Sequence, residues 1–255
     1  MNLVEKQRIV GAAPAGAADR DSAARAVREM FTSIAPRYDL LNHLLSFNVD
    51  RLWWRRAARA FRHVLRRRDA RVLDLCCGTG DMTFALSREA GKASPQIWGA
   101  DFSHTMLRRA AAKSIASAGH CSPIWIEADA LRLPFPSQHF DLVTSAFGFR
   151  NLADYDAGLR EIARVLRPEG ECRILDFGEP RGPIGALYRI YFKQVLPRVG
   201  TLISGVRGPY AYLPASVQRF PEPPEMIARM KNCGFTEATW TPYTFGIAGL
   251  YRGRK

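Results

Sequence analysis

The feature that most constrains the fold is a short apolar run that ends in a glycine turn and leads straight into a helix-forming segment. Residues 72–81 read VLDLCCGTGD. In a doubly wound α/β sheet, a strand of this kind carries a ligand at its carboxyl end, because glycines in the turn let the backbone approach the ligand closely. The pattern therefore predicts that a first strand over residues 71–76 ends at a ligand site.

The remainder of the chain repeats this alternation of strand and helix, which is typical of βαβ units and a mostly parallel sheet. The predicted strands cover residues 96–100, 123–127, 140–146 and 171–176, and the predicted helices cover 81–90, 104–117 and a segment from Asp154 that Pro168 and Gly170 stop. Two final strands over 235–240 and 245–252, with a turn near Pro242, predict an antiparallel hairpin at the sheet edge.

Two further segments lie outside this alternation. We expect residues 1–20 to form a flexible tail and residues 21–255 to form a single domain, in which residues 21–68 are an N-terminal helical cap. The cap is predicted to hold a helix from Asp21, a cluster of leucines, and a third helix that Asp50 caps. The leucines are Leu40, Leu41, Leu44 and Leu45.

Residues 178–224 interrupt the alternation with eight prolines and several aromatic residues. We interpret them as an insertion with one amphipathic helix around residues 187–195, followed by a loop. A helix over residues 224–232 is then expected to end at Gly234, in the left-handed conformation that glycine adopts easily.

The glycine turn is not the usual dinucleotide fingerprint. From Gly78 the chain reads GTGDMT, so Gly78, Thr79 and Gly80 are not followed by a third glycine. In addition, the carboxylate of Asp74 inside the strand repels a pyrophosphate and attracts a cationic amine. The sequence therefore favours a cationic ligand over a dinucleotide.

Two more acidic residues follow the ends of predicted strands. Asp101 lies 21 residues after Gly80, the spacing of an acid that binds ribose hydroxyls; the alternative is a cap for the helix from His104, which Ser103 could provide equally well. Asp129 is placed to accept a hydrogen bond from an adenine amine, while the backbone N–H of Ala130 donates to the ring; the alternative for Asp129 is a turn residue.

Together these three places describe a class I S-adenosylmethionine-dependent methyltransferase. That class has a Rossmann-like, mostly parallel seven-stranded sheet with an antiparallel edge hairpin. The cofactor predicted from these residues is S-adenosyl-L-methionine. The acceptor of the methyl group does not follow from them.

Composition bears on partners and compartment. The net charge is +13, and 31 of the 37 basic residues are arginine, which suits nucleic acid, anionic lipid or an acidic small molecule, or reflects a genome-wide bias toward arginine. Five cysteines without a CxxC pair, and no HExxH, predict a reduced chain with no metal site. The charges within residues 1–20 argue against a signal peptide, and no apolar run is long enough to span a membrane.

Several segments outside the cofactor motifs carry a more specific resemblance. Residues 31–54 read FTSIAPRYDLLNHLLSFNVDRLWW, residues 146–151 read AFGFRN, and VLPRVG at 195–200 is followed by YLP and by FP. With the glycine loop, these segments resemble the ubiquinone/menaquinone biosynthesis C-methyltransferase family (UbiE, also called MenG) over about residues 25–252.

The resemblance implies cofactor contacts at Thr79, Asp101, Asp129 with Ala130, and a residue just before FGFRN. That last position departs from the family pattern: some relatives have serine where this chain has Ala146, and Ser145, one residue earlier, is expected to point to the opposite face of the strand. Cys76 and Cys77 also replace residues that are commonly alanine or glycine in relatives, with no loss of function expected.

The resemblance further implies C-methylation of a polyprenylated quinol, either demethylmenaquinol, 2-methoxy-6-polyprenyl-1,4-benzoquinol or both. Tyr38, Asp39, Arg150 and Asn151 are expected on the substrate side, with a helix cap as the alternative for Asp39 and a structural salt bridge as the alternative for Arg150. No residue is identified as the catalytic base. The 178–224 insertion is expected to wrap the prenyl tail or else to pack on the sheet.

An arginine-rich stretch with Trp53 and Trp54 suits anionic headgroups, the alternative being a solvated basic face. Its arginines are Arg51, Arg55, Arg56, Arg59, Arg62, Arg66, Arg67, Arg68 and Arg71. A cytoplasmic enzyme, peripheral on the inner face of the membrane, is therefore expected.

The competing function is an RNA or protein methyltransferase that uses the basic surface. Against it, the chain has no appended RNA-binding domain, and the [D/N]-P-P-[Y/F] motif common in amino-group methyltransferases is missing after the fourth strand. A non-catalytic cofactor-binding module is the third possibility, and the complete set of cofactor motifs argues against it. The oligomeric state is not predicted.

Overall fold

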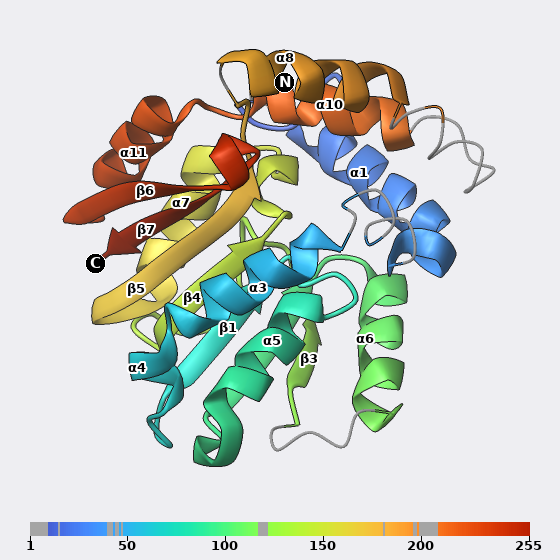
Figure 1. Ribbon diagram of the computed structural model, residues 1–255. Helices are drawn as coiled ribbons and strands as arrows, with labels where there is room; N and C mark the ends of the chain where they lie inside the picture. Colours follow the sequence, from blue (N-terminus) through green and yellow to red (C-terminus); the bar gives the residue numbers. More distant parts are fainter. Residues whose placement is uncertain are drawn as a thin grey trace, which may run out of the picture.

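The strands form a single seven-stranded sheet in the order β3-β2-β1-β4-β5-β7-β6 (Figure 1). The computed structural model describes residues 10–14, 16–39, 43, 46, 48–116, 122–180, 182–195, 198 and 209–255. The pairs from β3 through β5 are parallel, and β7 runs antiparallel between β5 and β6. This arrangement confirms the predicted fold class, including the antiparallel hairpin at the edge.

The strand order places β1 at the point where the sheet topology reverses, between β2 and β4. In such sheets a crevice opens at that point, beyond the carboxyl ends of the strands. The strands are β1 (Arg71–Leu75), β2 (Gln96–Asp101), β3 (Ile124–Glu127), β4 (Phe140–Ala146), β5 (Leu166–Phe177), β6 (Glu237–Tyr243) and β7 (Ala248–Arg254).

Helices cover both faces of the sheet and its carboxyl edge. The longer ones are α1 (Arg20–Ile34), α3 (Val49–Arg59), α5 (Asp81–Ala90), α6 (His104–Ala116), α7 (Tyr155–Val165), α8 (Gly182–Ile190), α10 (Pro209–Arg219) and α11 (Pro223–Asn232). The short ones are η1 (Ala35–Arg37), α4 (Arg62–Leu65), η2 (Gly91–Ala93), η3 (Phe149–Asn151), the π-helical turn η4 (Tyr191–Val195) and η5 (Thr244–Gly246).

Two apolar cores sandwich the sheet. On one face α7 and α11 bury Leu159, Ile162 and Met226 against the strands. On the other, α3, α4 and α5 bury Ala57, Leu65 and Leu86. Since helices cover both faces of the sheet, a ligand can approach it only at the ends of the strands.

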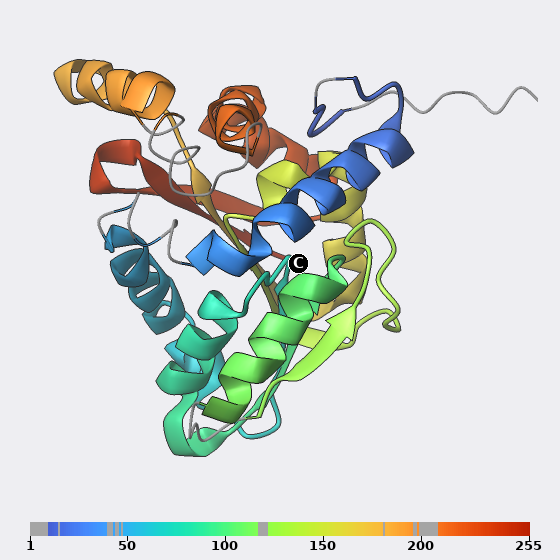
Figure 2. The same ribbon diagram turned by 90° about the vertical axis from the view of Figure 1, so that its right-hand side faces the viewer.

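The carboxyl edge is roofed by α1, α8 and α10, which come from segments far apart in the sequence (Figures 1 and 2). Helix α1 buries Ala23, Val27 and Ile34 and contacts α6 and α10. Before α1, the backbone N–H groups of Gly11 and Ala12 donate to the carbonyls of Ala153 and Leu152, at 3.1 and 2.7 Å. Residues 1–9 and 15 of the expected tail, and the leucine cluster at 40–45, lie outside the described residues.

Two expected helix boundaries are wrong. Helix α3 is preceded by Asn48 in the left-handed conformation (φ 59°), and Asp50 is its second residue, so Asp50 does not cap it. Helix α7 ends at Val165, before Pro168 and Gly170, and the chain passes directly into β5. The pairing register slips in that part of β5, which accommodates both residues inside the strand.

The C-terminal third also differs in detail from expectation. Part of the expected loop is helix α10, which contains Pro214. The proline removes one backbone hydrogen bond from the helix, and burial of Val217 and of Phe220 just after the helix offsets the lost stability. The hairpin turn is at η5, so Pro242 lies within β6, an edge strand where a missing N–H is tolerated. Gly234 follows α11 with φ 102°, close to the expectation. Among the described residues, no helix is long and apolar enough to cross a membrane.

Candidate active site

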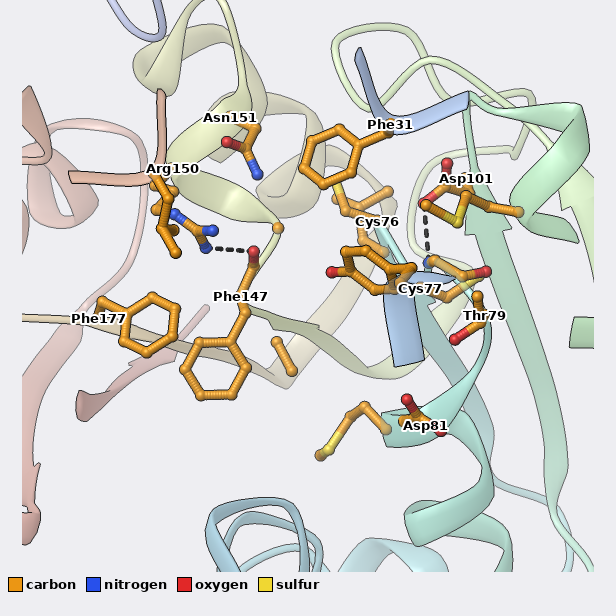
Figure 3. Close-up of a pocket in the computed structure, with 18 of the residues that line it drawn as sticks. Phe31, Cys76, Cys77, Thr79, Asp81, Asp101, Phe147, Arg150, Asn151 and Phe177 are labelled. Atoms are coloured by element: carbon orange, nitrogen blue, oxygen red, sulfur yellow. Dashed lines mark hydrogen bonds between the residues drawn. The ribbon is translucent and has the colours of Figure 1, made fainter. Parts of the chain in front are cut away.

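A cavity of about 380 Å³ lies between the carboxyl ends of the strands and the roofing helices. One end is lined by the polar strand ends and the glycine turn. The other end is lined by aromatic side chains from α3, α8, η4 and α10. In Figure 3, Asp101 and Thr79 lie on one side of this cavity, and Arg150, Phe147 and Phe177 lie on the other. The cavity therefore joins a polar subsite to an apolar one.

The glycine turn has the backbone that its sequence requires. Gly78 and Gly80 have φ of 56° and 88°, in the region that favours glycine. A side chain on Gly80 would come within 2.7 Å of the Trp125 ring, whereas a side chain on Gly78 would point into open space. Gly80 is therefore needed for packing, and Gly78 leaves bare backbone along the wall of the cavity.

Asp74 is fully buried and lines the cavity. One carboxylate oxygen, Oδ2, accepts a hydrogen bond from Thr83 Oγ1 at 2.5 Å, while Oδ1 has no hydrogen-bond partner among the residues that the structure describes. Burial raises the pKa of this carboxyl to about 7, although the Thr83 hydrogen bond acts in the opposite direction. An unpartnered buried oxygen of this kind fits a cationic ligand group, as the sequence predicts.

Asp101 is also buried at the end of the neighbouring strand. Its Oδ2 accepts from the Gly78 N–H at 2.8 Å, and its Oδ1 accepts from the Ser103 N–H at 2.9 Å. Burial raises its pKa to about 6. The carboxylate thus fastens the glycine turn to β2, and each oxygen keeps a lone pair for a ribose hydroxyl. The helix-cap alternative is not what the structure has, because the chain enters α6 after Ser103.

Asp129 and Ala130 line the cavity beyond β3. The Asp129 side chain is exposed, and its Oδ1 accepts from the Leu131 N–H at 2.9 Å, so a turn hydrogen bond is present. Ala130 is buried. With Asp74, Asp101 and the glycine turn on the same wall, the donor and acceptor set fits S-adenosylmethionine.

A lysine that the sequence analysis missed ties the cofactor wall to the N-terminal helices. Lys113 Nζ, on α6, donates to Thr79 Oγ1 at 3.0 Å, to Asp39 Oδ2 at 3.1 Å and to Asp81 Oδ1 at 2.8 Å. Thr79 Oγ1 itself donates to Asp39 Oδ1 at 2.5 Å. Asp39 therefore contacts the glycine turn. No local sequence pattern predicts this cluster of side chains, because its members come from three distant segments of the chain.

Arg150 forms the structural salt bridge that the sequence analysis gave as its alternative role, and it also lines the cavity. It is 5% exposed, its Nη1 donates to Asp176 Oδ1 at 2.9 Å and to the Phe147 carbonyl, and its Nε contacts Ser216 Oγ at 3.4 Å. The buried ion pair is therefore real. Nevertheless, Arg150 lines the cavity, and within the described part of the chain no hydrogen bond engages its Nη2.

Asn151 and Tyr38 also line the cavity, as expected for substrate-side residues. The Asn151 amide oxygen accepts from the Tyr212 hydroxyl of α10 at 3.2 Å, which leaves its NH₂ group for a ligand (Figure 3). The Tyr38 ring packs edge-on against Phe31 of α1, with 5.9 Å between centroids. Both side chains are thus positioned by the roofing helices.

The two departures from the family pattern have simple structural consequences. Ala146 lines the cavity, whereas Ser145 is buried elsewhere and is not among the described residues of the lining. The expected alternation is therefore confirmed. Burial raises the pKa of both the Cys76 and Cys77 thiols well above the ordinary value, which disfavours the reactive thiolate. No cluster of potential metal ligands occurs in the part of the chain described here.

The apolar end of the cavity is built from aromatic rings. Trp53 packs against Phe147 and Phe177, at 5.7 and 6.2 Å between centroids, and its indole N–H donates to Thr244 Oγ1 at 2.8 Å. Tyr188 and Phe192 stack nearby at 5.0 Å. Such a surface suits a hydrocarbon chain.

Comparison with known proteins agrees with this geometry. The model of the ubiE/COQ5 methyltransferase family matches residues 19–255. A demethylmenaquinone methyltransferase of Deinococcus radiodurans is 49% identical and covers 93% of this chain and 95% of its own length. One from Thermus thermophilus is 48% identical, covering 88% and 99%. The Geobacter sulfurreducens protein named ubiquinone/menaquinone biosynthesis C-methyltransferase UbiE is 43% identical, covering 90% and 88%.

Solved structures share the fold at low sequence identity. The [4+2]-cyclase SpnF has a TM-score of 0.65 at 17% identity and covers 96% of this chain and 98% of its own. A SAM-dependent methyltransferase from Aquifex aeolicus has a TM-score of 0.52 at 16% identity, covering 72% and 81%. These likenesses concern the fold alone.

We expect Lys113→Met to loosen the N-terminal helices from the cofactor wall. The change removes three charge-assisted hydrogen bonds in a partly exposed site, so the free energy of unfolding should fall by about 1–3 kcal/mol. Hydrogen exchange of residues 35–39 should rise at the same time. Urea unfolding and exchange mass spectrometry measure both, with Lys92→Met on the exposed η2 turn as the matched control. Equal stabilities of the two variants would contradict the assignment.

Proposed function

The chain belongs to the ubiE/COQ5 methyltransferase family, and we propose that it transfers a methyl group from S-adenosylmethionine to a ring carbon of a prenylated quinol. The observation that carries this proposal is that a carboxylate-lined wall and an aromatic wall belong to one continuous cavity. The first wall suits a cationic nucleoside ligand, and the second suits a ring with a hydrocarbon tail. A methyl acceptor placed between them lies beside the donor.

On the cofactor side, Asp74, Asp101, Thr79 and the backbone of the glycine turn, with Asp129 and Ala130, would hold S-adenosylmethionine. When bound, it supplies a methyl group on a positively charged sulfur. The residues of the chain orient it and exclude water, since the roofing helices cover the edge of the sheet. Arg150 and Asn151 hold the acceptor oxygen from the opposite side.

For the acceptor we propose demethylmenaquinol as the preferred substrate. The relatives named demethylmenaquinone methyltransferase are 48–49% identical to this chain, whereas the Geobacter relative named UbiE is 43% identical. The roofing segments, 21–68 and 178–224, act as a cap around the tail, supported by the cavity-lining side chains that both contribute.

The proposed function is tested by offering the purified chain three acceptors with labelled S-adenosylmethionine. These are a short-chain demethylated naphthoquinol, a 2-methoxy-6-prenyl-1,4-benzoquinol and total RNA. Mass spectrometry should find a new C–CH₃ group on the naphthoquinol ring and no label in RNA. Labelled RNA with unmodified quinols would support the competing methyltransferase function instead.

Arg150→Lys tests the role of the guanidinium without leaving Asp176 unpaired. Lysine keeps the positive charge but has a single terminal nitrogen, so it lacks the second terminal N–H group that could donate to a ligand while the first pairs with Asp176. Loss of one donor to developing phenolate charge commonly lowers turnover about 10²–10³-fold. We expect a loss of this size in turnover, with affinity for S-adenosylmethionine unchanged within threefold by calorimetry. If turnover is retained, or if thermal stability and affinity collapse together, Arg150 is purely structural.

We also propose that the basic face of α3 and α4 meets the anionic surface of the membrane that contains the substrate. Leu52 is 61% exposed, and the exposed Arg51 and Arg55 flank it, an arrangement suited to an interface. Among the described residues, Arg55, Arg59 and Arg66 form no ion pair, unlike Arg62, which pairs with Glu89 at 2.5 Å.

Replacing Arg55, Arg59 and Arg66 with Gln should weaken binding to anionic vesicles about a hundredfold, because each basic residue near such a surface contributes about 1 kcal/mol. Vesicle sedimentation measures the effect, and turnover of a water-soluble quinol should not change. The control removes equal charge from other faces by changing Arg108, Arg132 and Arg160 to Gln. An equal loss in both variants would mean that only net charge matters.

A further inference from the structure

A histidine–aspartate pair lies at the entrance of α3, beside the cavity. His43 Nδ1 and Asp50 Oδ2 are 2.8 Å apart, and Asp50 Oδ1 accepts from the Arg51 N–H, also at 2.8 Å. Asp50 is 4% exposed and lines the cavity, whereas the His43 side chain is 20% exposed. The pair therefore leads from the cavity wall toward solvent.

Further contacts surround the pair within the described residues. The His43 carbonyl accepts from the Asn48 N–H at 2.8 Å and from Ser46 Oγ at 3.3 Å, which closes the turn before α3. The imidazole packs edge-on against Trp54, at 5.8 Å between centroids. Asn48 at φ 59° supports the same turn.

Among the described residues that line the cavity, Asp50 differs from the other carboxylates by its position. Asp74, Asp101 and Asp129 belong to the cofactor wall, and Asp81 is paired with Lys113. Asp50 comes from α3, where its neighbours in the lining are Val49, Trp53 and Trp54. It is thus a carboxylate on the aromatic side, where the quinol ring belongs.

We propose that Asp50 accepts the hydroxyl proton of the quinol and that His43 is its positioning residue. This inference rests on the proposed function. As the hydroxyl O–H bond breaks, its proton moves to the Asp50 carboxylate and its electron pair forms a carbonyl. The ring carbon then forms the new bond to the methyl group, and the carbon–sulfur electron pair stays on sulfur, which becomes a neutral thioether.

The second half of the reaction restores the aromatic ring. The methylated carbon loses its hydrogen to water, and the carbonyl oxygen regains a proton from the Asp50–His43 pair. Overall, one proton is released for each methyl transferred, so atoms and charge balance. His43 keeps the carboxylate in one orientation and shares the proton that the carboxylate has taken up.

The test compares three variants in single-turnover assays with a saturating demethylated naphthoquinol. Asp50→Asn keeps the shape of the side chain but is not a base, and we expect it to lower the rate about 10²–10⁴-fold. Affinity for S-adenosylmethionine, measured by calorimetry, should stay within threefold. Asp156→Asn, the same chemical change on the surface of α7, is the matched control.

The exchanged pair, His43→Asp with Asp50→His, provides the decisive comparison. It rebuilds the hydrogen bond and places a base at the cavity wall. Its rate should therefore be at least tenfold higher than that of Asp50→Asn. If the pair were only structural, the exchanged variant would regain the thermal stability of the wild type but its rate would stay as low as that of Asp50→Asn.

The possible failures are distinguishable. If the wild-type chain methylates the quinol and Asp50→Asn keeps a rate within threefold of it, the assignment of Asp50 is wrong and the proposed function stands. If Asp50→Asn is slow and the folded exchanged pair recovers nothing, Asp50 is not acting as a base. If the wild-type chain methylates no quinol, the proposed function falls and this inference falls with it.

Discussion

The site depends on two carboxylates that are buried from solvent near the carboxyl ends of neighbouring parallel strands. Asp74 is the last but one residue of β1 and Asp101 is the last residue of β2. Burial raises the pKa of Asp74 to about 7 and that of Asp101 to about 6. Desolvation of an ionised carboxylate is unfavourable unless a positive charge or hydrogen-bond donors compensate it. Asp101 accepts hydrogen bonds from two backbone N–H groups, whereas one oxygen of Asp74 accepts none from the described part of the chain. A cationic ligand bound beside Asp74 would supply the missing compensation.

The same interaction organises the surrounding elements. Asp101 holds the Gly78 N–H, so the glycine turn is fixed to β2 before any ligand arrives. Thr79 in that turn contacts Asp39, and Lys113 joins both to Asp81 at the start of α5. The N-terminal helices that roof the cavity are therefore fastened to the wall that carries Asp101 and the glycine turn, and the aromatic end of the cavity lies beside it.

The sequence predicts what is encoded locally and misses what is assembled from distant segments. The strand–glycine–helix pattern of residues 71–90, the alternation of strands and helices after it, and the acids Asp101 and Asp129 at strand ends are all local signals. The fold and the cofactor class could therefore be predicted from them. Lys113 meets Asp39 across 74 residues, and Arg150 meets Asp176 across 26, and neither contact leaves a periodic signal. Asp50 could be recognised as a polar residue near a helix start, but its contact with His43 depends on the hydrogen bonds that the His43 carbonyl accepts from Ser46 and Asn48. The turn between β6 and β7 lies later in the chain than expected. Its position follows from the pairing of β7 with β5, and a contact between distant segments cannot be read from local propensity.

The most direct test of this account is the number of protons released when S-adenosylmethionine binds. A cation beside Asp74 favours the ionised form, so binding below pH 7 should expel a proton, and affinity should rise as pH increases through about 7. Calorimetry in buffers of different ionisation enthalpy measures this release, and Asp74→Asn accounts for titration of the ligand itself. The account predicts release of close to one proton at pH 6 in the wild-type chain beyond that in Asp74→Asn, and almost none at pH 8.5. Identical proton release by both proteins across this range would contradict it.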